Sequence, residues 1–178
     1  MPDLIGDLID ILRIDSDRWR ALAQGLDRDL LARPPAAGEW SALQCLVHAA
    51  DTEAQVFTAR IRAIKDGRPE LPGYDPDVQG TPVTPKTDAM AVAERLAVQR
   101  RDSLALLAAV TDADLDRTSR HTDLGLVTLR ELLNEWAAHD MMHLVQAERA
   151  VIQPFIPGSG PWRFYFADHD VEAPKPTA

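Results

Sequence analysis

The sequence predicts an all-α protein built as a four-helix bundle, and three observations lead to that prediction. Apolar residues recur at steps of three and four over most of the 178 residues, no stretch shows the alternation of a half-buried strand, and a Pro-rich segment separates the second and third helical stretches. Amphipathic helices without strands bury their apolar stripes against one another. This length fits one domain, so we assign residues 1–170 to a single helical domain with an aromatic C-terminal segment, and we expect a disordered tail at residues 171–178.

The first two helices are marked by an apolar stripe and by a capping signal. Residues 3–25 carry an amphipathic stripe made of Leu4, Leu8, Leu12, Trp19, Leu22 and Leu26. Pro34-Pro35 ends that region, and Ser41-Ala42-Leu43-Gln44 then has the form of a capping box that begins the second helix. The second helix closes at Gly67 and Pro69, and its apolar stripe consists of Leu43, Leu46, Val47, Ala50, Ala54, Phe57, Ile61 and Ile64.

The second half of the bundle begins after a long connection. The chain from Pro69 to Pro85 holds five prolines and two glycines, and a loop of this length can cross a bundle end between the second and third helices. Apolar residues from Met90 to Ala108 mark the third helix, and Thr111–Asp114 suggests a short capped turn. A second capping box at Thr128–Glu131 begins the fourth helix, which we place over residues 129–152.

Composition and charge exclude several classes of partner. The chain has 19 basic and 28 acidic residues, a formal net charge of −9, and its densest basic group in sequence is Arg95, Arg100 and Arg101 on one helical face. This balance disfavours nucleic acid and anionic membrane surfaces. Cys45 is the only cysteine, which excludes an internal disulfide, and no apolar run reaches the roughly 18 residues of a membrane span. With an acidic N-terminal segment unlike a secretory signal, we expect a cytoplasmic protein.

Two histidines on the fourth helix carry the strongest functional signal. His139 and His143 are four residues apart and fall within the apolar stripe of that helix, so both face inward one turn apart. Buried imidazoles need partners, which are either hydrogen-bonding groups or a metal ion. His48 on the second helix lies about 140° from Leu43 on a helical wheel, off the apolar stripe, and periodicity alone predicts a solvated residue there. The spacing therefore leaves the third ligand open.

Three segments in order resemble the DinB/YfiT-like superfamily over about residues 3–153. They are Gly38-Glu39-Trp40-Ser41 leading into Val47–Glu53, then Gly125 with Thr128–Leu133, then His139–Gln146. The resemblance implies a four-helix bundle in an up-down-down-up arrangement, often dimeric, so we expect a homodimer. It also implies a divalent metal held at one end of the bundle by His48, His139 and His143.

The chemistry of such a site follows from its ligands. Three neutral imidazoles leave the ion its positive charge and at least one open position, and all-imidazole ligation suits zinc or nickel, with iron and copper as alternatives. Characterised relatives in the superfamily use low-molecular-weight thiols, so the leading hypothesis is a metal-dependent enzyme that activates a thiol for S-transfer to, or isomerisation of, a small electrophile. The alternatives are a hydrolase that uses metal-activated water and a non-catalytic, stress-related metal-binding protein.

Further residues have weaker claims, and no catalytic residue is assigned. Arg100 and Arg101 are candidates to bind an anionic cosubstrate, although exposed helix charges are the simpler interpretation. His121 could cap the site or replace His48 as a ligand. The aromatic run Pro161–Phe166 is expected to pack back over the bundle, where it could close the site, because large exposed apolar patches are rare.

The remaining polar residues near the histidines are expected to play supporting or structural parts. Asp140 gives His139–His143 a superficial likeness to the HExxH of zinc peptidases, but we expect it to lie on the helix surface or to orient a ligand imidazole. Asp51 lies about 60° from His48 on the helical wheel and could support the site, but a helix-surface carboxylate is the simpler interpretation. Cys45 is one turn before His48 and could approach the ion, but we expect an inert packing residue, and we expect His169 to be solvated.

Overall fold

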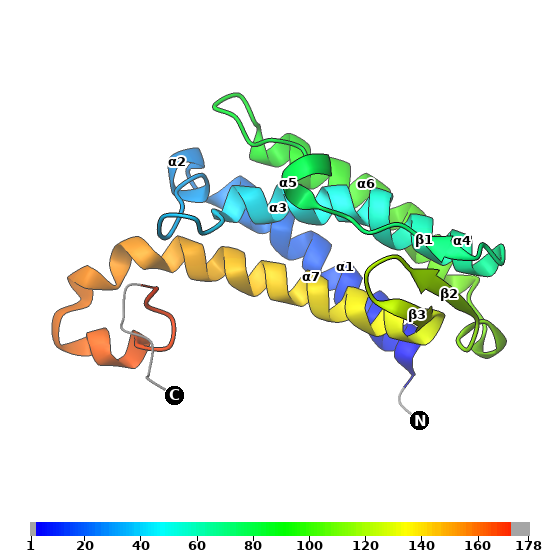
Figure 1. Cartoon of the computed structure of the whole chain (residues 1–178). Coiled ribbons are helices and arrows are strands. Elements are labelled where there is room, and N and C mark those ends of the chain that lie inside the picture. Colours follow the sequence, from blue (N-terminus) through cyan, green and yellow to red (C-terminus); the bar gives the residue numbers. More distant parts are fainter. Residues whose placement is uncertain (1–2, 172–178) are drawn as a thin grey trace.

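The computed structural model describes residues 3–171 and is a bundle of long helices (Figure 1). The four long helical segments of the bundle are α1 (Leu4–Gly25), α3 (Ala42–Thr52) with the helical turns that follow it, α6 (Ala89–Ala108) and α7 (Leu129–Ile152). Both α1 and α3 pack against α6 and α7. In Figure 1, α1 and α7 run in one direction while α3 and α6 run in the other. The predicted helical bundle is confirmed.

Both predicted capping boxes begin helices. The Ser41 hydroxyl accepts from the Gln44 amide, and the Ser41 amide donates to the Gln44 side chain at 2.9 Å. The amide of Thr128 donates to Glu131 Oε2 at 2.7 Å, and the Thr128 hydroxyl accepts from the Glu131 amide. Each pair satisfies donors that a helix N-terminus leaves without partners, so both helices begin where the sequence predicts.

The second predicted helix contains a π-helical turn that the apolar periodicity of the sequence does not predict. η1 (Glu53–Phe57) joins α3 to α4 (Thr58–Lys65), and the Thr58 hydroxyl donates to the carbonyl oxygens of Glu53 and Ala54. A π turn accommodates one extra residue and so changes which side chains face inward. Ala54, predicted on the apolar stripe, is exposed, and Glu53 is buried in its stead.

The prediction that the chain has no strands is wrong. β1 (Glu70–Leu71), β2 (Thr118–His121) and β3 (Gly125–Thr128) form a small sheet in which β1 pairs parallel with β2, and β2 pairs antiparallel with β3. Strands of two to four residues are too short to show a period-two pattern in sequence. The sheet covers the end of the bundle where α7 begins (Figure 1).

The Pro-rich connection is held against α3 by Asp51. It contains β1 and α5 (Pro76–Gln79), and Asp51 accepts from the amide and hydroxyl of Thr81 at 2.7 and 3.1 Å. Arg95 on α6 pairs with the same carboxylate at 2.8 Å. Asp51 is therefore a buried anchor, and the expectation of a surface carboxylate is wrong, because the connection folds over this face of α3.

A layer of charged side chains divides the apolar core into two clusters. One cluster is centred on Trp19, Leu43 and Leu144, and the other on Phe57 and Trp136. Between them along the helices, the four long segments each contribute a buried charged residue to this layer: Asp15 from α1, Glu53 from η1, Arg100 from α6 and Asp140 from α7. Burying a charge costs folding free energy unless the charge is paired, so these residues need oppositely charged partners within the layer.

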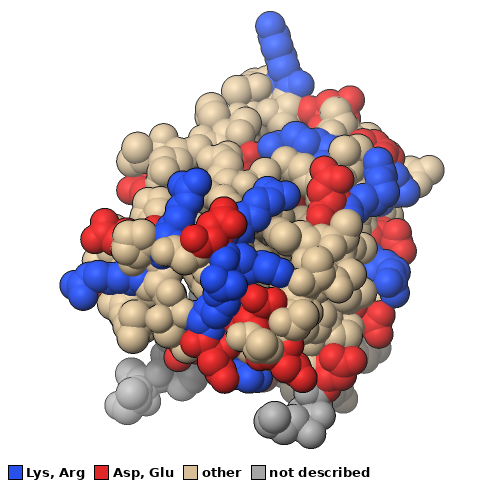
Figure 2. Space-filling view, turned by 90° about the vertical axis from the view of Figure 1, so that its right-hand side faces the viewer, with Lys and Arg blue, Asp and Glu red and all other residues tan. Residues whose placement is uncertain are grey.

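Basic side chains gather on the strand-bearing end of the molecule. Figure 2 faces this end, and Lys and Arg lie across its middle with acidic groups among and below them. Exposed members include Arg62 on α4, Arg68 in the following loop, and Arg117 and Arg120 beside or in β2. They come from distant parts of the sequence, which is why sequence neighbours alone indicated no such gathering. The interleaved acids give the face mixed charge.

The segment after α7 does not pack over the bundle as predicted. It comprises the 3₁₀ helices η3 (Gln153–Phe155) and η4 (Pro157–Phe166), and Trp162, Phe164 and Tyr165 are each about two-thirds exposed. The segment turns back only to the end of α7, where Arg149 donates to the carbonyl oxygen of His169. None of the helices in residues 3–171 has the length and apolar character to cross a bilayer.

Candidate metal centre

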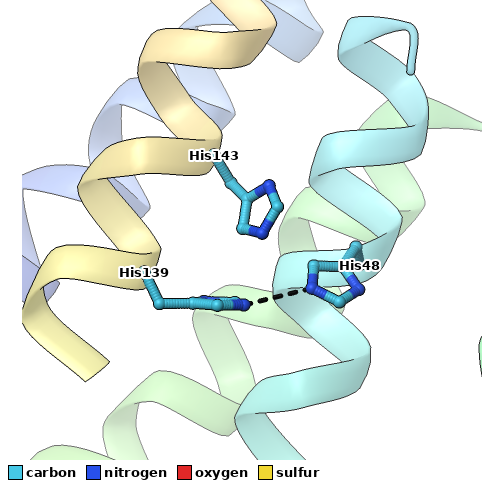
Figure 3. A group of neighbouring side chains, drawn as sticks. All are labelled: His48, His139 and His143. Carbon is cyan, nitrogen blue, oxygen red and sulfur yellow. Dashed lines mark hydrogen bonds between the residues drawn. The ribbon is translucent and has the colours of Figure 1, made fainter. Parts of the chain in front are cut away.

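Three histidines converge about halfway along the bundle. His48 projects from α3 towards His139 and His143 on α7, and one ring nitrogen of each lies within 4.8 Å of the others (Figure 3). The Nε2 atoms of His48 and His139 are 3.1 Å apart. Two zinc–nitrogen bonds of about 2.05 Å at a tetrahedral angle place their nitrogens about 3.3 Å apart, so this spacing is close to that of two ligands of one ion.

The surroundings keep the imidazoles in the form that a metal requires. Burial, together with the neighbouring His143 and His139, lowers the pKa of His48 to about 3, and burial and His139 lower the pKa of His143 to about 4. Both rings are therefore neutral near pH 7. His143 Nδ1 lies 2.9 Å from the Gln146 side-chain oxygen, which fixes the proton on Nδ1 and leaves Nε2 as a free electron-pair donor. This donor set fits a divalent transition metal.

Aromatic rings hold the histidines on two sides. Trp40 stacks on His143 with ring centroids 5.7 Å apart and meets His48 edge-on at 4.9 Å. Phe57 stacks on Trp136 and contacts the His139 ring edge-on at 5.1 Å. Neither Trp40 nor Phe57 was predicted from the sequence to take part in the site. Trp40 stands immediately before the Ser41 cap, and that position, one residue outside the helix, was the available signal.

The charged layer of the core reaches the centre through Asp140. Its Oδ1 lies 3.9 Å from His139 Nδ1, and its Oδ2 accepts from Arg100 at 2.6 Å. Arg100 also pairs with Glu53 at 3.2 Å. Burial alone would raise the pKa of Asp140, but Arg100 and His139 lower it, so Asp140 is the ionised member beside the ligand. It is buried, not on the helix surface, and it faces the His139 ring as an orienting group would.

A cavity of about 450 Å³ opens beside the three histidines. Its wall also includes Arg60, Glu135 and His121. Desolvation raises the pKa of Glu135, against the opposing influence of His139 and Arg60. Within residues 3–171, no cysteine, carboxylate or further histidine joins the three imidazoles as a fourth ligand. The arrangement is that of an open site, and it lies at mid-bundle, not at a bundle end as the family resemblance implied.

His121 and the two candidate arginines take other places. His121 lies on the cavity wall but outside the ligand group, 3.0 Å from Arg60. Arg100 is 2% exposed between two carboxylates, so the expectation that it binds a cosubstrate does not hold: its guanidinium is not accessible to a ligand. Arg101 is exposed on α6, where it contacts the Ala97 carbonyl oxygen, and it lines no part of the cavity.

Cys45 and His169 behave as expected. Cys45 is fully buried, and burial raises the pKa of its thiol to about 12, so it stays protonated and does not act as a ligand. His169 is exposed near the end of the C-terminal segment.

The comparison with protein families decides the relationship of this chain. The model of the DinB superfamily matches residues 11–147, which span all three histidines. The chain belongs to the DinB superfamily. Among solved structures, this DinB protein is similar to YfiT from Bacillus subtilis, described as a probable metal-dependent hydrolase with an unusual four-helix bundle topology. The two share 20% sequence identity and a TM-score of 0.76 over 87% of this chain and 89% of YfiT. No curated protein matches the chain.

Proposed function

We propose that this DinB protein is a metal-dependent hydrolase of small molecules whose divalent cation, zinc or nickel, is held by His48, His139 and His143. The observation that carries the proposal is the convergence of three imidazoles on the wall of an open cavity without a fourth protein ligand. Structural metal sites are closed by protein ligands, whereas catalytic ones keep a position for water or substrate. The fold shared with YfiT supports the same reaction class.

The residues around the cavity have separate tasks in such a reaction. A bound divalent cation supplies Lewis acidity and lowers the pKa of coordinated water towards 7. Trp40 and Phe57 hold the ligand rings and limit the access of bulk water to them. Asp123 and Glu135 are carboxylates on the cavity wall, and Glu135, one helical turn before His139 on α7, can accept a proton at its side-chain oxygens.

The geometry favours hydrolysis over the other two hypotheses. The two arginines predicted to bind an anionic thiol cosubstrate, Arg100 and Arg101, do not face the cavity beside the histidines. A purely structural metal would be closed off, and the aromatic C-terminal segment, which was one candidate to seal the site, lies exposed at the far end of α7. Assembly as a homodimer and a cytoplasmic location stay predictions.

The first test is the metal content of the purified protein by elemental mass spectrometry. We expect about one zinc or nickel ion per chain, and loss of that ion in the His139→Ala/His143→Ala double variant. His169→Ala is the matched control, since that histidine is exposed and outside the cavity. The loaded protein is then assayed against esters, amides and phosphoesters of small acids. No ion in wild type after reloading, or an ion without turnover of any of these, would refute the hydrolase.

A further inference from the structure

A second polar group lines the cavity, separate from the metal centre. Arg60 on α4 lies on the same cavity wall as the three histidines and is half-buried. It is 12 residues after His48, which would place the two side chains about 120° apart on a regular α-helix. The π turn at Glu53–Phe57 absorbs one residue and reduces that angle to about 20°. The two residues therefore face the same cavity because of this turn.

The Arg60 guanidinium is only partly satisfied. Its Nη2 donates to the Pro72 carbonyl oxygen at 2.9 Å and contacts His121 Nε2 at 3.0 Å. Nε and Nη1 have no acceptor among residues 3–171, and no carboxylate of those residues forms an ion pair with Arg60. Glu135 and Asp123 interact with it only at longer range. A guanidinium carries five donors, so most of its hydrogen-bonding capacity is available to a ligand.

The contact with His121 leaves a further hydrogen-bond donor without an acceptor. His121 Nδ1 faces the Asp123 amide at 3.1 Å, and Nε2 faces Arg60, so both ring nitrogens face donors. A neutral imidazole has one acceptor nitrogen and one N–H, and burial together with Arg60 lowers the pKa of His121, which keeps it neutral. His121 can therefore accept from only one of these two donors, the Asp123 amide or the Arg60 guanidinium. An oxyanion in the cavity would provide the missing acceptor.

We propose that Arg60, positioned by Pro72 and His121, binds a carboxylate group of the substrate, so that the hydrolysed compounds are small molecules bearing a carboxylate a short distance from the scissile bond. Planar guanidinium groups match carboxylates through two parallel hydrogen bonds. The cavity volume of about 450 Å³ lies within the range of sites that bind small molecules. That the bound compound is a substrate rests on the proposed hydrolase function, but binding of its carboxylate does not require turnover.

The test measures binding of N-acetylglycine and of its neutral analogue N-acetylglycinamide by NMR titration, with metal-free and zinc-loaded protein. We expect wild type to prefer the acid about tenfold to a hundredfold, and Arg60→Gln to lose that preference in both forms. Arg62→Gln is the control, because Arg62 is exposed on the same helix and is not on the wall of this cavity. Arg60→Lys, which keeps the charge, should retain part of the preference.

The outcomes separate this inference from the proposed function. A preference for the acid that depends on Arg60, without hydrolysis of any compound, would support the carboxylate site and refute the hydrolase. Equal affinity for the acid and the amide in wild type, or an equal loss in Arg60→Gln and Arg62→Gln, would overturn the carboxylate site even in an active enzyme. A preference seen only with zinc and unchanged in Arg60→Gln would assign the carboxylate to the metal and overturn it as well.

Discussion

Asp15 is a buried carboxylate whose removal should stabilise the protein. Both of its oxygens are buried without a hydrogen-bond partner, and its side chain is 0% exposed. Desolvation, with repulsion from Asp140, raises its pKa from 3.8 to about 6 despite the opposing attraction of Arg100. A pKa difference of about two corresponds to about 3 kcal/mol between the two protonation states. At pH 8 the ionised Asp15 therefore costs about 2 to 3 kcal/mol of folding free energy, which Asp15→Asn should recover.

The pH dependence of this effect provides the control. Because the folded pKa lies above the unfolded one, the destabilising contribution of Asp15 in wild type is lost as the pH falls from about 6 to about 4, and the variant lacks this contribution at every pH. The advantage of Asp15→Asn in urea unfolding should thus shrink across this window, and any difference left below pH 4 reports packing alone. Asp17→Asn, an exposed carboxylate on the same helix, should show no such change. An advantage that is absent at pH 8, or independent of pH, would refute the reasoning.

Three other predictions concern the core and the histidines. Arg100→Met should cost about 3–5 kcal/mol in urea unfolding, since it leaves two buried carboxylates unpaired; an unchanged midpoint would contradict the pairing. Cys45 should not react with a thiol reagent at pH 8 until the protein is unfolded, because its thiol is buried and protonated; fast reaction in the native state would show otherwise. His48 and His143 have folded pKa values of about 3 and 4 against 6.5 unfolded, so metal-free protein should lose stability as the pH falls from about 6.5 to about 4, and His143→Asn should lose less.

The sequence predicted the relative positions of those site residues that lie together on one regular α-helix. His139 and His143 lie on a straight α-helix, where a spacing of four residues fixes their relation, so the sequence predicted their approach. His48 could not be placed from its own helix, because it lies beside the apolar stripe and faces α7 across the bundle. The family resemblance supplied it. Arg60 and His121 depend on the π turn and on strands of four residues or fewer, neither of which leaves a periodic signal.

The polar layer was missed for a different reason. Asp15, Glu53, Arg100 and Asp140 are single charged residues on four separate helices, and each taken alone is typical of a helix surface. Only the alignment of the helices brings them to one level, beside His139. Buried charges are retained at a cost to stability. Here the ionised Asp140 faces the ligand imidazole of His139, so the buried charges serve to orient the metal site and do not stabilise the fold.

The π turn itself can be tested by deletion. If η1 holds one extra residue, removal of the exposed Ala54 should convert it to regular α-helix while the residues that follow keep their faces, with a loss of stability within about 1 kcal/mol. Removal of Ala59, also exposed but beyond the turn, rotates the rest of α4 by about 100° and turns Ile61 and Ile64 out of the core. Exposure of two buried isoleucines costs about 3–6 kcal/mol. Urea unfolding of the two variants compares these losses, and equal losses would show that the turn does not carry the extra residue.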